Sequence, residues 1–182
     1  EAFALQGHEV SLLVAERDNP IKENAFDYYG ISSEARSRIS ISYIKSPNLI
    51  KWGKIGFWIQ GWLFGEAAAL HMRKDWPDVV YSRDHIILLN MILIHKNLVL
   101  EAHRGETGFA VNTLLRKAKL VSITYGLAHM YEKLTSRILI APDAVDLREF
   151  EVTLSRDECR RAVGLPTNKK IALYWGHLYG WK

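Results

Sequence analysis

The sequence contains a single cysteine, Cys159, so no disulfide bond can form within the chain. A lone thiol is typical of proteins from a reducing compartment. The sequence also lacks a run of about 18 apolar residues, the length that a membrane-spanning helix needs. Its first ten residues, EAFALQGHEV, lack the basic start and the long apolar run of a signal peptide. These absences predict a cytoplasmic protein without a membrane-spanning helix.

A strong charge excess and metal-ligand patterns are also missing. Lysine and arginine outnumber aspartate and glutamate by 24 to 20, which gives a net charge of +4. This excess is too small to indicate nucleic-acid binding, but it suits an anionic small ligand or an anionic membrane surface. The scattered histidines at positions 8, 71, 95 and 129 lack the spacing of metal ligands. We therefore expect neither a metal site nor a cofactor.

Short apolar runs alternate with longer helical patterns along most of the chain. The runs predict strands at residues 9–16, 39–45, 78–83, 97–103, 119–124 and 137–143. The segments between them predict helices at residues 48–74, 85–96, 108–118 and 126–134, and a loop at 18–38. This alternation predicts an α/β protein with a Rossmann-like parallel sheet and helices on both faces.

A change in composition after residue 141 predicts a division into domains. Residues 1–141 would form the Rossmann-like domain, and the polar, turn-rich residues 142–155 a linker. A short helix at about residues 156–163, capped by Ser155, and a strand at 171–177 would begin a second Rossmann-like domain. Both ends of the sequence are abrupt, so we expect further sequence beyond them, including the first strand of the sheet.

Candidate ligand-binding residues follow two of the predicted strands. Ligands of open parallel sheets bind at the carboxyl ends of the strands. Four basic or imidazole side chains lie there: Arg83, His85, His103 and Arg104. Glu101 and His103 share one strand face, because side chains alternate along a strand, so His103 could point into a cleft. The alternative is a rim histidine bonded to a loop carbonyl, with Arg83 solvated and Asp84 acting only as a helix cap.

The end of the chain, KKIALYWGHLYGWK (169–182), combines an apolar run, Gly176 and a final lysine, Lys182. A strand, a glycine loop and a cation are typical of a phosphate site, particularly where a helix follows. The loop does not match the GxxxxGK[ST] pattern of nucleotide triphosphatases. A surface loop after a core strand is the alternative.

Several of these segments together resemble family 4 retaining glycosyltransferases of the GT-B fold. RILIAPDAVDLREF (137–150) is similar to the PDGVD strand end that closes the family's first domain, with Ala144 in place of glycine. GHLYGWK (176–182) is similar to the family's G-R-L-x-x-x-K-G loop, with His177 in the arginine position. Earlier strands of the family's first domain resemble LQGHEVSLLV, DVVYSRD, LVLEAHR and LVSITYGLAHMYEKL. The resemblance covers nearly the whole chain.

The resemblance implies an enzyme that transfers a sugar, with retention, from a nucleotide-diphosphate sugar to a hydroxyl of a glycan or a lipid-linked acceptor. Such enzymes serve polysaccharide, glycolipid or glycoconjugate synthesis. Residues 1–141 would be the acceptor-side domain, and residues 156–182 the start of the donor-binding domain. His103 would be the cleft histidine near the donor sugar, and the donor diphosphate would be held by Gly176, His177 and Lys182. The family's donor site extends beyond this loop, so the 182-residue chain alone would be inactive.

Two other functions remain open. One is a membrane-surface or partner-binding module built on the aromatic residues 50–64. The other is a nucleotide-sugar epimerase of the same broad shape. An epimerase needs a Tyr-x-x-x-Lys pair and a dinucleotide glycine loop, and YEKL (131–134) does not supply the pair.

The aromatic stretch LIKWGKIGFWIQGWLFG (49–65) has two interpretations. At helical spacing, one apolar stripe consists of Ile55, Trp58, Ile59 and Trp62. In the first interpretation this stripe packs on the sheet. In the second, Phe57 and Phe64 lie outside the stripe and, with the tryptophans, Lys51 and Lys54, form an interfacial helix. This helix would hold the protein peripherally on the anionic inner face of a membrane.

The phosphate-loop hypothesis makes a direct prediction for Lys182. A charge-assisted hydrogen bond to the donor diphosphate would be lost in Lys182→Ala, so donor binding by the full-length enzyme should weaken by about 1.5–3 kcal/mol. Calorimetric titration with the nucleotide-diphosphate sugar measures this loss. Unchanged donor affinity would contradict a phosphate-binding role for this loop.

Overall fold

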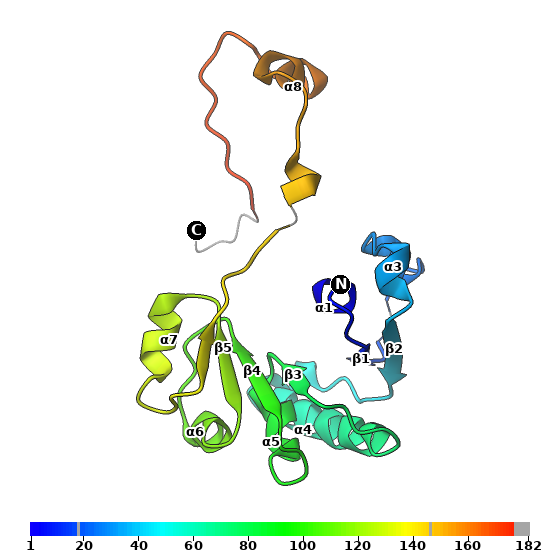
Figure 1. Cartoon of the computed structure of the whole chain (residues 1–182), viewed down its shortest axis with the longest axis vertical. Coiled ribbons are helices and arrows are strands. Elements are labelled where there is room, and N and C mark those ends of the chain that lie inside the picture. The colour runs from blue at the N-terminus through cyan, green and yellow to red at the C-terminus, as the bar shows by residue number, and fades with distance from the viewer. Residues whose placement is uncertain (18, 146, 177–182) are drawn as a thin grey trace. The chain divides into compact units, whose positions relative to one another are not determined.

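The computed structural model describes residues 1–17, 19–145 and 147–176. The chain divides into two compact units, Glu1–Asp143 and Ala144–Lys182, which are described separately below (Figure 1). The sequence placed the end of the first domain at residue 141.

The first unit is an α/β structure whose strands pair in parallel. β1 (Val10–Ala15) pairs with β2 (Ile39–Ile44) in one sheet. A second sheet has the order β3 (Val80–Ser82), β4 (Leu98–Ala102), β5 (Lys119–Ser122) and β6 (Ile138–Ile140). All six strands lie within the predicted ranges, and the prediction of a parallel α/β class is confirmed. The described strands form two sheets rather than the one predicted, because an apolar run shows that a strand is buried but not which strand it pairs with.

Helices connect these strands. They are α1 (Ala2–Leu5), α2 (Ala25–Tyr28), α3 (Ser33–Arg36), η1 (Ile50–Trp52), α4 (Gly53–Met72), α5 (His85–Met91), α6 (Phe109–Leu115) and α7 (Tyr125–Tyr131). The prediction of a loop over residues 18–38 was wrong, because α2 and α3 lie there. Each is a single turn held by a side-chain cap: Asn24 accepts from the Phe26 amide, and Ser32 from the Ala35 amide. Such short helices have no apolar periodicity, so only their caps could have indicated them.

The core of the first unit lies on one face of the four-stranded sheet. Side chains alternate along β4, so Leu98 and Leu100 are buried with Leu120 of β5. The helices α4, α5, α6 and α7 contribute the residues that cover this face (Figure 1). The opposite face includes Tyr81, whose ring meets that of Phe3 in α1 at a centroid distance of 6.1 Å. The helices that contribute to the core thus lie on one face of this sheet, and the prediction of helices on both faces is not confirmed.

Glycines let α4 and α5 approach closely. A Cβ built on Gly65 would lie 2.3 Å from Asn90 Nδ2 and 3.3 Å from the Ile87 Cα. Asn90 cannot move away freely, because its Nδ2 donates to the Ile86 carbonyl at 3.1 Å. Gly65 is therefore required at this helix contact.

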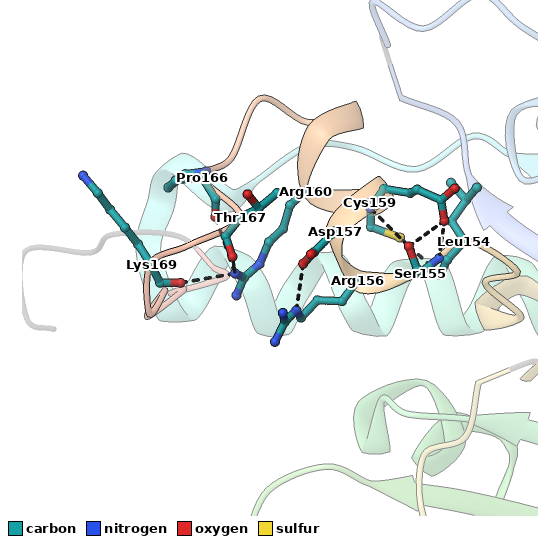
Figure 2. A network of polar contacts seen from close by, with 10 residues as sticks. Leu154, Ser155, Arg156, Asp157, Cys159, Arg160, Pro166, Thr167 and Lys169 are labelled. Atoms are coloured by element: carbon teal, nitrogen blue, oxygen red, sulfur yellow. Dashed lines mark hydrogen bonds and ion pairs between the residues drawn. The ribbon is translucent and has the colours of Figure 1, made fainter.

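The second unit begins with η2 (Leu147–Phe150) and contains α8 (Arg156–Ala162). Ser155 forms the predicted cap: its Oγ accepts from the Glu158 amide, and the Glu158 carboxylate accepts from the Ser155 amide in return. Arg160 then holds the following turn, because its guanidinium donates to the carbonyls of Thr167 and Lys169 at 3.0 and 3.2 Å (Figure 2). Local hydrogen bonds thus give this segment its shape.

The predicted strand at residues 171–177 is absent from its described part, residues 171–176. These residues include the exposed side chains of Leu173, Tyr174 and Trp175. A strand needs a neighbour to receive its backbone hydrogen bonds, and the described residues of this unit contain no other strand. The prediction of a strand was therefore wrong for residues 171–176.

The close helix contact at Gly65 predicts that the same glycine-to-alanine change will have different effects at positions 65 and 126. Gly65→Ala should destabilise the protein by about 1–3 kcal/mol, because the added methyl overpacks the contact between α4 and α5. Gly126→Ala in α7 should be neutral or stabilise by up to about 1 kcal/mol, because its Cβ would meet nothing closer than 4.0 Å. Urea unfolding of both variants measures the difference. Equal effects would show that helix propensity, and not close packing, governs position 65.

Candidate functional site

The carboxyl ends of the neighbouring strands β3 and β4 carry a polar cluster centred on Glu101. Its Oε1 accepts from Arg83 Nε at 3.0 Å and also bonds His103 Nε2. Its Oε2 accepts from the hydroxyl of Tyr81. The Glu101 side chain is only 14% exposed, so a mostly buried carboxylate joins a cation, an imidazole and a phenol. We call these four residues the Glu101 cluster.

The cluster shifts the pKa values of two of its members. Burial, the largest single influence on Glu101, favours the neutral acid, but hydrogen bonds from Tyr81 and His103 and the charge of Arg83 together outweigh it. The pKa of Glu101 is therefore lowered. Burial raises the pKa of Tyr81, and the hydrogen bond to Glu101 and the repulsion from its charge raise it further. At neutral pH the cluster thus keeps a carboxylate and a protonated phenol.

A second group of charged side chains surrounds Glu106, in the loop after β4. Glu106 Oε2 lies 2.8 Å from Nδ1 of His85, and its Oε1 lies 2.6 Å from Nε of Arg104. The ring of Trp58 in α4 meets the His85 ring edge-on, with a centroid distance of 5.6 Å. The beginning of α5, the loop after β4 and the long helix α4 therefore meet at this point.

Tyr131 holds the loop after β4 in place. This residue of α7 is only 2% exposed. Its hydroxyl donates to the Arg104 carbonyl at 3.0 Å and accepts from the Glu106 amide at 2.7 Å. The backbone that presents Arg104 and Glu106 is thus fixed by two hydrogen bonds to a buried side chain.

An open hollow of about 440 Å³ lies beside the second group. Its lining includes Lys54, Phe57, Trp58, His85, Arg104 and Glu106. Aromatic rings offer flat apolar surfaces, while the carboxylate and the cations offer hydrogen-bond partners of both signs. This combination suits a small polar molecule that has both hydroxyl groups and apolar C–H faces.

The structure groups the four cleft residues predicted from the sequence into two pairs. Arg83 and His103 meet at Glu101, and His85 and Arg104 meet at Glu106. The contact between Glu101 and His103 confirms the prediction that they share one strand face. The alternative prediction, that His103 bonds a loop carbonyl, was wrong for Nε2, because this atom bonds the Glu101 carboxylate. Asp84 caps α5 as predicted, since its side chain accepts from the Ile86 amide.

The predicted phosphate loop is described only at its first residue. Gly176 has a φ of +148°, a conformation that L side chains rarely adopt. His177 and Lys182 lie outside the described residues. Their assignment remains a prediction.

Sequence reasoning missed three contributors to the site. Tyr81 could have been found, because strand alternation places it on the same face as Arg83, two residues later. Glu106 could have been suspected from Arg104, its ion-pair partner two residues earlier. Its contact with His85 and the contacts of Tyr131 gave no local signal, because those partners lie on other elements of the fold.

The structure contradicts part of each interpretation of the aromatic stretch at residues 49–65. The stripe that would pack on the sheet is exposed instead: the exposed fractions are 73% for Ile55 and 45% for Trp58, with similar values for Ile59 and Trp62. Phe57 is 46% exposed, as the interfacial interpretation required. Phe64 is not, because it packs against the core. The helix itself was predicted correctly, but the side of it that faces the sheet was predicted wrongly.

The described residues contain no group of three or more histidine, cysteine, aspartate or glutamate residues arranged to hold a metal ion. No helix among them combines the length and the apolar character needed to cross a membrane. The chain matches no family model and no curated protein sequence.

The lowered pKa of Glu101 predicts a particular dependence of stability on pH. A carboxylate whose folded pKa is depressed contributes stability above its ordinary pKa of 4.5, and this contribution disappears as the pH falls through the folded value. Glu101→Gln should therefore lower the free energy of unfolding near neutral pH, and its difference from the wild type should shrink in acid. Urea unfolding from about pH 7 down to about pH 3 measures this.

Glu132→Gln is the matched control. Glu132 contacts only the exposed His129 among the ion pairs described, at 2.9 Å and with 60% of its side chain exposed. Its replacement should leave the pH profile close to that of the wild type. A pH-independent difference for Glu101→Gln would show that the carboxylate charge does not stabilise the cluster.

Proposed function

We propose that the chain is part of a family 4 retaining glycosyltransferase of the GT-B fold. The observation that carries the proposal is the contact of His103 with Glu101, beside Arg83, at the carboxyl end of a central parallel strand. Ligands of open parallel sheets bind at this edge, and the resemblance of LEAHR to the family's cleft-histidine strand assigns the same position to His103. The first unit would be the acceptor-side domain.

The strand order supports a Rossmann-like assignment for the first unit. The chain advances through β3, β4, β5 and β6 in one direction, and β1 and β2 form a separate parallel pair. Doubly wound sheets extend in two directions from a switch point, and their ligands bind beside it. In the proposal, residues 142–155 link to a second Rossmann-like domain, of which residues 156–182 are the beginning.

The reaction separates two charges. The leaving diphosphate becomes more negative while the sugar becomes oxocarbenium-like. Catalysis therefore requires cations near the diphosphate and an oriented polar group near the sugar. In the proposal Gly176, His177 and Lys182 bind the diphosphate without a metal. His103 contacts the donor sugar and orients it, and it is not a nucleophile. An imidazole at position 177 is a weaker and more pH-dependent cation than the family's arginine.

Glu101 fits the role of holding His103. Its carboxylate fixes the Nε2 edge of the ring, and Tyr81 and Arg83 in turn fix the carboxylate. A ring held in this way loses little freedom when it meets a substrate, which is the value of preorganisation. The hollow bounded by Trp58 and Glu106 would take the hydroxyl-bearing acceptor, a glycan or the head of a lipid-linked saccharide.

The epimerase alternative has less support. It needs a tyrosine that acts on the substrate with a lysine four residues later, and Tyr131 has Thr135 at that position. The Tyr131 hydroxyl is buried and already bonded to two backbone groups of the loop after β4. It is therefore a structural group and not a reacting one.

Donor screening tests the function. The protein as the cell makes it would be incubated with labelled uridine, guanosine and adenosine diphosphate sugars and with extracted saccharide and lipid acceptors. Release of the nucleoside diphosphate together with label in the acceptor supports the proposal. Interconversion of the donor sugar without transfer would instead establish the epimerase.

The assignment of His103 predicts a loss of turnover without a loss of stability. His103→Ala should reduce kcat by about 10²–10³-fold, the effect of removing one preorganised polar group near the reacting charge. Its melting temperature should change little, because Glu101 keeps its contacts with Arg83 and Tyr81. His129→Ala is the control, since this histidine is 84% exposed and pairs only with Glu132 among the ion pairs described. Full activity of His103→Ala would exclude the assignment.

A further inference from the structure

The two nitrogens of the His103 ring have different surroundings. Nε2 bonds Oε1 of Glu101, and the side chain as a whole is 31% exposed. Within residues 1–17, 19–145 and 147–176, the other nitrogen, Nδ1, makes no hydrogen bond. The described residues thus engage one nitrogen of a partly exposed ring and leave the other to a ligand.

The state of the Glu101 carboxyl group decides which ring nitrogen carries hydrogen. Its oxygens also accept from Arg83 Nε at 3.0 Å and from the hydroxyl of Tyr81. Burial favours the neutral acid, but the hydrogen bonds of Tyr81 and His103 and the charge of Arg83 together lower the pKa of Glu101. An ionised carboxylate can only accept hydrogen bonds. The nitrogen that faces it must therefore donate, which places a hydrogen on Nε2.

We propose that Glu101 is a positioning residue that fixes His103 as the Nε2–H tautomer and keeps Nδ1 as an acceptor for a substrate hydroxyl group. A neutral imidazole carries one N–H, so its second nitrogen keeps a lone pair. That lone pair accepts from an O–H group and repels the oxygen of a carbonyl or a phosphate. The identity of the ligand rests on the proposed sugar transfer, whereas the tautomer rests only on the contacts of the Glu101 cluster.

A fixed tautomer matters for chemistry because the hydrogen bond at one ring nitrogen sets the state of the other. In catalytic triads, the change of the orienting aspartate to asparagine leaves the geometry intact but gives the wrong tautomer, and kcat falls about 10⁴-fold. Glu101 stands in the same relation to His103. Its own orientation is set by two further donors, Arg83 and Tyr81.

Two other histidines of the chain serve as internal references. His95 Nε2 lies 2.7 Å from the Pro77 carbonyl, and its Nδ1 accepts from the Asn97 amide at 3.2 Å. A carbonyl only accepts and an amide N–H only donates, so His95 is an Nε2–H tautomer. His85 presents its other nitrogen to a carboxylate, since Nδ1 lies 2.8 Å from Glu106 Oε2. The same rule therefore predicts the opposite tautomer, Nδ1–H, for His85.

Nitrogen NMR tests the tautomer without any assay of sugar transfer. The protein would be labelled with ¹⁵N-histidine, and long-range ¹⁵N–¹H spectra would be recorded at about pH 9, well above the ordinary imidazole pKa of about 6.5. A ring nitrogen that carries hydrogen resonates at a much lower frequency than a bare one. We expect His103 to give the pattern of His95, and His85 the reverse. A hydrogen on Nδ1 of His103, or an averaged pattern at its two nitrogens, would overturn the proposal.

Glu101→Gln tests the part that the carboxylate plays. A glutamine amide offers both an acceptor and a donor, so the preference of His103 for Nε2–H should be lost. The pattern of His95 should not change, which verifies that the variant is folded. Glu132→Gln is the control, because this carboxylate contacts His129 at 2.9 Å, and His103 should keep the wild-type pattern in it. An unchanged His103 pattern in Glu101→Gln would show that the carboxylate does not set the tautomer.

A double-mutant cycle separates positioning from a merely structural role. In the sugar-transfer reaction, Glu101→Gln should lower kcat by at least about tenfold. In the His103→Ala background the same change should cost less than about twofold, because the ring that Glu101 orients is already gone. Equal losses in both backgrounds would overturn the positioning role. Absence of sugar transfer by the wild-type protein would contradict the proposed function instead, and the NMR spectra would still decide the tautomer.

Discussion

The alternation of side chains along β4 is the constraint on which both the core and the candidate site depend. Leu98, Leu100 and Ala102 point to one face of the sheet and are buried there, while Glu101 points to the other. A shift of one residue in the pairing of β4 would place the Glu101 carboxylate in the core and the leucines outside. The register in which Leu100 pairs with Leu120 and Glu101 pairs with Val121 is therefore held by the burial of apolar side chains. The position of Glu101 follows from that burial.

Buried hydrogen bonds fix the backbone around the candidate site, which lies at the edge of the sheet. The loop after β4 would otherwise be held only at its ends. The buried hydroxyl of Tyr131 satisfies two of its backbone groups, and leaving such groups unpaired would cost about 1–3 kcal/mol each. The beginning of α5 is fixed in a similar way by Asp84, which caps the helix and leaves the next residue, His85, beside Glu106. The hydrogen bonds of Tyr131 and Asp84 thus both stabilise the fold and fix the geometry of the candidate site.

Local signals were predictable from the sequence, whereas the relations between distant residues were not. Each strand of the first unit and the caps at Asp84 and Ser155 depend on residues within one short segment, and all of them were predicted correctly. The side of α4 that faces the sheet was predicted wrongly because apolar residues lie on most sides of this helix, so periodicity alone cannot distinguish the packed side from the exposed side. The packed side is decided by the small volume of Gly61 and Gly65, which lets α5 approach. The contacts that Tyr131 makes could not be predicted either, because it lies 27 residues from Arg104 in the chain.

The long helix α4 serves both the core and the candidate site. Its first turns contribute Lys54, Phe57 and Trp58 to the hollow beside Glu106. Its later turns contribute the small buried residues Gly65 and Ala68 to the side that packs against the core. Because close-packed helices transmit displacements, the position of the aromatic wall of the hollow depends on how closely α5 can approach Gly65. The glycines of α4 therefore help to fix the place at which its aromatic side chains meet His85 and Glu106.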